Sequence, residues 1–185
     1  MTGFFFALLA VFLAGIGARD QMLLAGITAR QGARGVLLMV ALTTGIAASA
    51  FAAWGAVAIA PMLNSSARML LAAMALGLAG LEALALRPPR APAEPTHSLG
   101  AAAIVLLAHQ LTDSARFLIF AIALATAAPI PAGIGGAAGS IGALVAGWLG
   151  GSDLLRPTLS TARRVTGGVL LLIAVFVGMR AFGSF

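Results

Sequence analysis

Cysteine and lysine are absent from this chain, and acidic residues are scarce. Without cysteine there is no disulfide, no thiolate metal ligand and no thiol nucleophile. The 11 arginines and 5 acidic residues make up 9% of the 185 residues, whereas charged residues make up about a quarter of a typical soluble domain. This scarcity excludes a soluble globular enzyme and a disordered chain. Nucleic-acid binding is also excluded, because the arginines are spread through loops and form no phosphate-binding face.

Long apolar runs are what the sequence does contain. Apolar residues make up 61% of the chain, and the mean hydropathy is +1.07. A membrane-spanning helix needs about 20 mostly apolar residues, and turn residues and a Pro-rich stretch divide the runs at that spacing. The sequence thus predicts an all-α, polytopic membrane protein with six transmembrane helices. These helices are expected over residues 3–29, 36–60, 66–86, 99–127, 131–150 and 162–182.

Arginine is distributed unevenly between the two sides of these six spans. Because cytoplasmic loops carry an excess of basic residues, the imbalance predicts a cytoplasmic Pro-rich linker and both termini outside. Abundant alanine, and arginine without lysine, indicate a GC-rich bacterial genome, so the expected location is the inner membrane of a bacterium, with the lipid bilayer as a partner. The arginine-rich side has Arg30, Arg34, Arg87, Arg90, Arg156, Arg163 and Arg164, and the other side has Arg68 and Arg180.

An internal repeat appears at a constant offset of 95 residues. Residues 66–68 (Ser-Ala-Arg), the polar start of the third span, align with residues 161–163 (Thr-Ala-Arg), the start of the sixth. Each half, 1–86 and 99–185, then has three helices, and residues 87–98 form the linker. Since three is odd, the second half is inverted relative to the first. Many secondary transporters are built in this way, with the substrate site near the midplane where the halves meet.

Four charged side chains fall near the predicted centre of the bilayer. Arg19 and Asp20 lie midway along the first span, and Asp113 and Arg116 lie midway along the fourth. Each would cost about 2.5–3.5 kcal/mol at a helix centre, so they are expected to face the protein interior and to pair. Ionisable residues inside the membrane indicate an ion or proton pathway by default. The alternative is a salt-bridge cluster that only fixes helix packing.

Helical spacing groups further polar residues around these charges. His109, Asp113 and Arg116 are four and three positions apart, which places them on one face of a continuous helix. Gly15 and Gly17 favour a bend in the first span, which would free backbone carbonyls as ion ligands. The expected pathway residues are Asp113, Asp20, Gln110, Thr112, His109, Arg19, Arg116, Gly17 and Gln21.

Two short segments resemble the repeated signature of the Gdt family, also called the transmembrane-protein-165 family. The signature reads Glu-x-Gly-Asp-Lys/Arg-Thr/Ser and occurs once in each three-helix half. In the first segment, Gly17 and the basic Arg19 match it. In the second, Asp113 matches its acid and Gln110 stands at its Glu position. The size of the chain, its six expected spans and its short polar linker also resemble the family.

This resemblance implies a transporter that exports Mn²⁺ or Ca²⁺ from the cytoplasm in exchange for protons. Asp113 would be the main ligand, with Gln110, Thr112 and Asp20 as secondary ligands. His109 or Asp20 would carry the proton. The resemblance therefore implies a divalent-cation site on Asp113, Asp20 and Gln110, with an inorganic cation and a proton as partners. Neither a resident cofactor nor an enzyme activity is expected.

The charge balance of these residues keeps other hypotheses open. Two intact signatures bring four acids and two bases, whereas the charges of Asp20, Asp113, Arg19 and Arg116 sum to zero. The chain would then be a transport-inactive family member that packs against another membrane protein, or a carrier of a different substrate. An intramembrane hydrolase using Ser140 is disfavoured, because this serine lies in a stripe of small residues.

Overall fold

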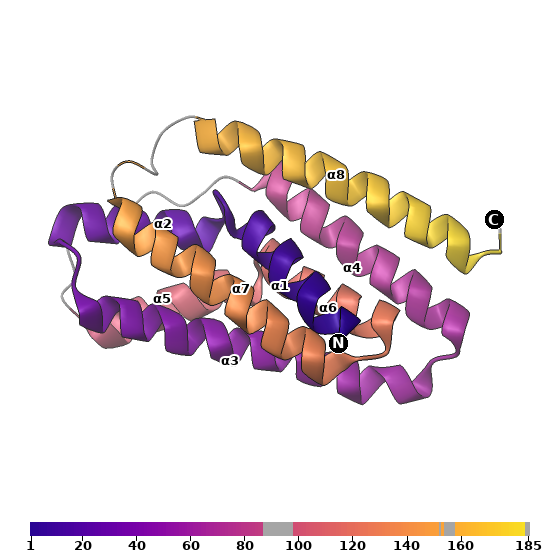
Figure 1. Cartoon of the computed structure of the whole chain (residues 1–185). Helices are drawn as coiled ribbons and strands as arrows, with labels where there is room; N and C mark the ends of the chain where they lie inside the picture. Colours follow the sequence, from indigo (N-terminus) through magenta and orange to yellow (C-terminus); the bar gives the residue numbers. More distant parts are fainter. Residues whose placement is uncertain (87–97, 152, 154–157, 184–185) are drawn as a thin grey trace.

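The chain forms a bundle of roughly parallel and antiparallel helices (Figure 1). The computed structural model describes residues 1–86, 98–151, 153 and 158–183, and within these residues the regular structure is entirely helical. The helices are α1 (Thr2–Gly15), α2 (Arg19–Gln31), α3 (Gly35–Ile59), the 3₁₀ turn η1 (Ala60–Met62), α4 (Ser65–Ala85), α5 (Leu99–Leu111), α6 (Ser114–Thr126), α7 (Pro129–Gly150) and α8 (Thr158–Ala181).

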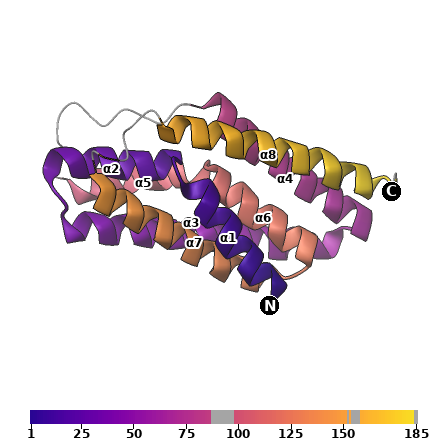
Figure 2. The ribbon, with the colours of Figure 1, turned by 45° about the horizontal axis from the view of Figure 1, so that its top comes forward.

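Four helical segments are each long and apolar enough to cross a membrane, namely α3 with η1, α4, α7 and α8. Two further candidates are bent pairs: α1 with α2 turns by 51°, and α5 with α6 turns by 48°. The described residues therefore supply four spans, or up to six if each bent pair is one span. The start of α1 and the end of α8 lie toward the same end of the bundle (Figures 1 and 2).

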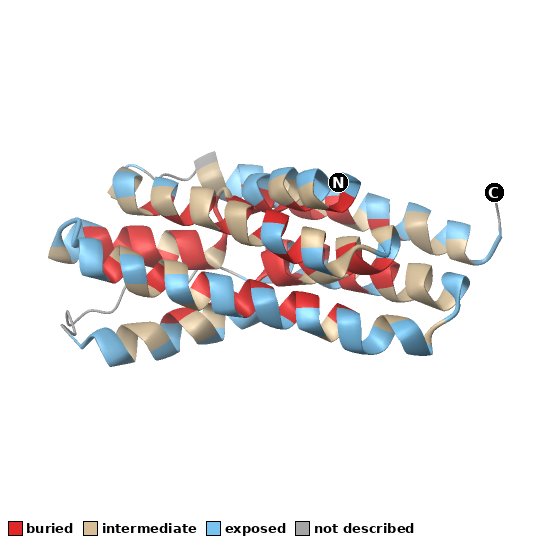
Figure 3. Cartoon of the chain, turned by 60° about the horizontal axis from the view of Figure 1, so that its bottom comes forward, coloured by how far each residue is buried: buried red, intermediate tan, exposed pale blue. Residues whose placement is uncertain are grey.

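The outside of the bundle is rich in apolar side chains, whereas buried residues line its axis (Figure 3). Phe5, Phe51 and Trp54 are each more than half exposed, and many other large apolar residues are exposed as well. A soluble protein does not expose so continuous an apolar surface, but lipid suits it. The fold is therefore that of a helical membrane protein.

Glycines allow the bent pair α1–α2 to pack closely along α7. A Cβ added at Gly139 would lie 2.5 Å from the carbonyl oxygen of Leu8, and one at Gly135 would collide with the Phe4 backbone. Further along α7, a Cβ at Gly147 would lie 2.8 Å from Cγ of Gln21. Small residues let membrane helices approach in this way. The small-residue face of α7 therefore fixes the position of both halves of the bent pair.

The sequence predicts the straight helices to within a few residues at each end. The segments expected over 36–60, 66–86, 131–150 and 162–182 are confirmed as α3, α4, α7 and α8. The bend expected at Gly15 and Gly17 is confirmed too, because α1 ends at Gly15 and α2 begins at Arg19. The linker expected over 87–98 lies outside the described residues, apart from Ser98.

The continuous helix expected over residues 99–127 is wrong. Helix α5 ends at Leu111, and Asp113 has the extended backbone (φ −86°, ψ 152°) of an N-cap for α6. Its carboxylate accepts a hydrogen bond from the backbone N–H of Ala115, which satisfies a donor that the start of a helix leaves free. Aspartate at a helix start is favourable even inside an apolar run, so the helix restarts here.

Candidate functional site

The two helix breaks lie beside each other in the bundle (Figure 2). Arg19 is the first residue of α2, and His109 lies in the last turn of α5. Their side chains are in contact, with 2.7 Å between Nη2 of Arg19 and Nδ1 of His109. A region where two spans lose their helical hydrogen bonds side by side has an unusually polar interior for a membrane protein.

At the first break, the backbone conformation of one glycine and the side chain of one glutamine provide hydrogen bonds for the polar groups. Gly17 has a positive φ of 77°, a conformation that other residues adopt at a cost. Its backbone N–H donates to Oε1 of Gln21 at 2.7 Å, and Nε2 of Gln21 donates to the carbonyl oxygen of Ala143 at 2.8 Å. Asp20 is buried, and its Oδ1 accepts from the backbone N–H of Gln21 at 2.7 Å.

At the second break, some buried polar atoms have no hydrogen-bond partner among the described residues. Asp113 and Gln110 are both 0% exposed. Oδ2 of Asp113 accepts from Ala115, and Nε2 of Gln110 donates to the carbonyl oxygen of Ala41 at 3.1 Å. Oδ1 of Asp113 and Oε1 of Gln110, however, have no hydrogen-bond partner among the described residues. A buried acceptor without a partner costs about 1–3 kcal/mol, so two at one helix break indicate a site for a ligand.

Arg116 reaches the same region from the first turn of α6. Its Nη1 donates to Oγ of Ser140 at 2.7 Å, while Nε and Nη2 have no partner in the described part of the chain. A Cβ placed on Gly45 would lie 3.4 Å from Nε2 of Gln110 and 3.7 Å from Nη2 of Arg116. Both side chains thus meet beside α3, where the absence of a side chain at Gly45 makes room for them.

Glu82 joins the cluster from α4. Its position near the end of a span predicts that it reaches the membrane interface or pairs with Arg87, a residue outside the described ones. Instead Glu82 is buried, with Oε1 2.7 Å from Nη2 of Arg163 on α8 and 3.5 Å from Nη1 of Arg19 on α2. The prediction that the Glu82 side chain extends out to the membrane interface is therefore wrong, because α8 packs on α4 at this level and brings a buried arginine that holds the carboxylate inside the bundle.

Two glycines bring the helices of this ion pair close together. Gly80 lies two residues before Glu82, and Gly167 lies four residues after Arg163. The two glycines pack directly on each other: a Cβ at Gly80 would lie 2.8 Å from the carbonyl oxygen of Gly167. These glycines let α4 and α8 approach closely enough for the buried pair to form, but in a chain with 23 glycines they do not identify the partners.

Charge in this cluster is balanced. The charges of Asp20, Glu82 and Arg116 all act on Asp113, and those of Arg19 and Asp20 act on His109. The three carboxylates, of Asp20, Glu82 and Asp113, are matched by the guanidinium groups of Arg19, Arg116 and Arg163. The expectation that Arg19, Asp20, Asp113 and Arg116 face the interior is confirmed. The expected pairing among them is wrong for the described residues, because the ion-pair partner of Arg19 is Glu82.

The prediction that His109, Asp113 and Arg116 lie on one face of a continuous helix is wrong. Because the helix breaks between Leu111 and Ser114, His109 turns to Arg19 whereas Arg116 turns to Ser140. Thr112 does not join the cluster: it is exposed, and its hydroxyl donates to the carbonyl oxygens of Ala108 and His109. The predicted stripe assumed a helix that the Asp113 cap interrupts.

The oxygen atoms of Asp20, Gln110 and Asp113 are the candidate ligands for a cation. Among the described residues there is no group of three or more His, Cys, Asp or Glu side chains that could hold a metal ion. Comparison with protein-family models, with curated proteins and with solved structures gives no match to this chain. Its function is therefore inferred from the chemistry of its own residues.

Proposed function

We propose that this chain is a transporter of the Gdt type, which exchanges a divalent cation, Mn²⁺ or Ca²⁺, for protons across a bacterial inner membrane. The observation that carries the proposal is the pair of buried acceptor oxygens at the second helix break, Oδ1 of Asp113 and Oε1 of Gln110, which have no hydrogen-bond partner in the described part of the chain. Hard cations such as these bind carboxylate and amide oxygens.

The positions of the helix starts support a two-fold internal repeat. Arg19, which starts α2, and Ser114, which starts α6, are 95 residues apart. Helices α3 and α7 start 94 residues apart, and α4 and α8 start 93 residues apart. If each bent pair is one span, each half has three spans and the second is inverted, as in other carriers with broken helices at the centre.

In this arrangement Asp113 would be the main cation ligand, with Gln110 and Asp20 completing an oxygen set across the two breaks. His109 or Asp20 would carry the proton. The bundle end formed by the start of α8 and the end of α2 would be cytoplasmic, since arginine predominates there. Both termini would then be outside, and cation export would run from the arginine-rich end.

A second candidate function is favoured by the arginines. Nε and Nη2 of Arg116 have no partner among the described residues, and the cluster is neutral without a dication. Adding two positive charges to a neutral buried cluster is unfavourable unless an arginine moves away. The same scaffold would then carry another substrate, or serve as a transport-inactive packing partner of a different membrane protein.

Transport in proteoliposomes tests the first candidate. Vesicles with an acidic lumen and a Mn²⁺-sensitive dye inside should accumulate Mn²⁺ from outside as protons leave. Asp113→Asn should reduce the rate by at least about 10–100-fold, because the loss of supporting groups around a metal alone has effects of that size. Asparagine also caps helices well, so α6 should stay intact and the change isolates the charge.

Asp153→Asn is the matched control, since it makes the same chemical change in the segment between α7 and α8, and it should transport normally. Calorimetric titration of the detergent-purified protein with Mn²⁺ adds a second measurement, with binding expected in the native chain and lost in Asp113→Asn. A folded, reconstituted protein that neither binds nor moves Mn²⁺ or Ca²⁺ under a pH gradient would leave the second candidate.

A further inference from the structure

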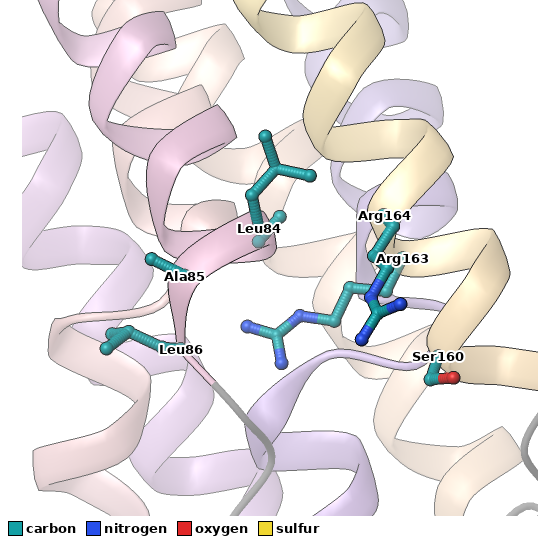
Figure 4. Close-up of a pocket in the computed structure, with 7 residues that line it drawn as sticks. Leu84, Ala85, Leu86, Ser160, Arg163 and Arg164 are labelled. Carbon is teal, nitrogen blue, oxygen red and sulfur yellow. The ribbon is translucent and has the colours of Figure 1, made fainter.

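A pocket of about 350 Å³ lies between the end of α4 and the start of α8 (Figure 4). Its α4 wall is apolar and consists of residues 83–86, while its α8 wall consists of Ser160, Arg163 and Arg164. The Arg163 side chain extends from α8 toward the end of α4, while the guanidinium of Arg164 stays closer to α8 (Figure 4). The pocket thus combines an apolar wall with two guanidinium groups.

The charged residues in the described lining of this pocket are both arginines. Arg163 is only 4% exposed, and its Nη2 contacts Glu82 while its Nη1 has no partner among the described residues. Glu82 is shared with Arg19, so one carboxylate faces two arginines before Arg164 is counted. Arg164 is exposed and adds a further positive charge at the mouth of the pocket. An anionic hydrogen-bond acceptor would bind favourably here, because it would pair with the buried N–H donor and offset the positive charge.

The depth of the pocket identifies the kind of anion. The α4 span ends at Ala85, and the α8 candidate span begins at Leu159, so the pocket lies where the apolar part of both helices stops. Lipid headgroups lie at this level. Leu84 and Leu86 are 42% and 47% exposed beside the arginines, so an amphipathic anion can place apolar atoms on the leucines and its charge on the guanidinium groups.

We infer that this pocket binds the phosphate of an anionic phospholipid, with Arg163 and Arg164 holding the headgroup. The site is separate from the proposed cation ligands. Arg163 holds Glu82 as well, so the informative substitution is at the exposed Arg164. Arg180, which is exposed at the other end of the same helix, provides the matched control.

The experiment measures thermal unfolding of the detergent-purified chain during titration with short-chain phosphatidylglycerol. The unfolding temperature of the native chain should rise on titration, and phosphatidylcholine and inorganic phosphate should have much smaller effects. Arg164→Gln should weaken the apparent affinity for phosphatidylglycerol about fivefold, Arg164→Lys should restore most of it, and Arg180→Gln should leave it unchanged.

Three outcomes would overturn the inference. Equal affinities for phosphatidylglycerol in Arg164→Gln and Arg180→Gln would mean that the lipid acts elsewhere. Stabilisation by inorganic phosphate as strong as that by the lipid would mean that the pocket binds a free anion. No stabilisation of the native chain by phosphatidylglycerol, with its unfolding transition otherwise cooperative, would mean that the pocket has no lipid preference.

Discussion

The two helix breaks differ in how they satisfy their polar atoms. The first depends on backbone geometry: Gly17 takes a positive φ, the N-cap Ala18 has no side-chain hydrogen bond, and Gln21 uses both ends of its amide. The second depends on side chains: Asp113 caps α6, yet Asp113, Gln110 and Arg116 each keep polar atoms without a partner among the described residues.

This difference indicates different roles for the two breaks, one mainly in packing and the other mainly in ligand binding. At the first break Arg19 also keeps Nε and Nη1 without a hydrogen-bond partner among the described residues, but Oε1 of Gln21 and Oδ1 of Asp20 are both paired, so a cation gains little by entering it. A break with buried acceptors and donors that lack hydrogen-bond partners is stabilised by a ligand that pairs with them. The first break therefore mainly positions the bundle and offers only Asp20 as a proposed cation ligand, whereas the second carries the main part of the proposed binding function. Substitutions should affect folding at the first break and ligand binding at the second.

The largest stability effect is expected for Gly17→Ala. An L-residue in the left-handed region costs about 1–2 kcal/mol, and the new Cβ would lie 2.8 Å from the carbonyl oxygen of Leu159. We therefore expect a loss of about 2–4 kcal/mol in the free energy of unfolding in mixed micelles. Gly183→Ala is the control, since Gly183 has a similar positive φ of 70° but has nothing within 4 Å of the added Cβ. An equal loss in both variants would mean that contact with the start of α8 is unimportant.

The next effect compares the two buried glutamines. Gln21→Leu removes two hydrogen bonds and leaves the N–H of Gly17 without its partner, while the carbonyl of Ala143 keeps its place in α7, so the change should cost about 1–2 kcal/mol. Gln110→Leu loses one bond to Ala41 but also removes an acceptor that already lacks a partner, so it should change stability by less than about 0.5 kcal/mol.

Cation binding should show the opposite order for the same two variants. Gln110→Leu should weaken Mn²⁺ binding, whereas Gln21→Leu, where it remains folded, should not. The measurements are unfolding in mixed micelles and calorimetric titration. If both glutamines affect stability and binding alike, the two breaks do not have separate roles.

Much of the fold follows from local features of the sequence. Apolar runs of span length, ended by turn residues, predict α3, α4, α7 and α8, because each is a local signal that neighbours do not override. The bend at Gly15 and Gly17 is also local, since glycine alone makes the φ of 77° at Gly17 inexpensive. The four helices and the bend could be predicted without knowing how the helices pack.

The candidate site could be predicted only in part, because its contacts are long-range. Helical spacing around His109 and Arg116 assumed a continuous helix, and a single cap at Asp113 changed the direction of every side chain beyond it. Glu82 and Arg163 are 81 positions apart, and no periodicity within either helix indicates that they pair. The sequence identified most polar residues of the candidate site, but it did not identify the residues that they contact.

The last comparison concerns the arginine of the second break. Ser140 is the partner of Arg116 across α6 and α7, at 2.7 Å, so Ser140→Ala would leave all three guanidinium nitrogens of Arg116 without a partner among the described residues. Membrane hydrogen bonds average about 0.6 kcal/mol and reach about 1.7 kcal/mol, so a loss of about 1 kcal/mol is expected. Ser49→Ala is the control, because the buried Ser49 donates only to Gly45 of its own helix and its loss should be close to zero.

The same pair of serine variants also separates the two candidate functions. If Arg116 must move away for a cation to enter, releasing it from Ser140 should tighten Mn²⁺ binding even as it lowers stability. If the native arginine position is what the substrate recognises, Ser140→Ala should weaken binding instead. Ser49→Ala should change neither quantity, and a shared change in both variants would show that packing of α3 and α7, rather than the Arg116 contact, controls the second break.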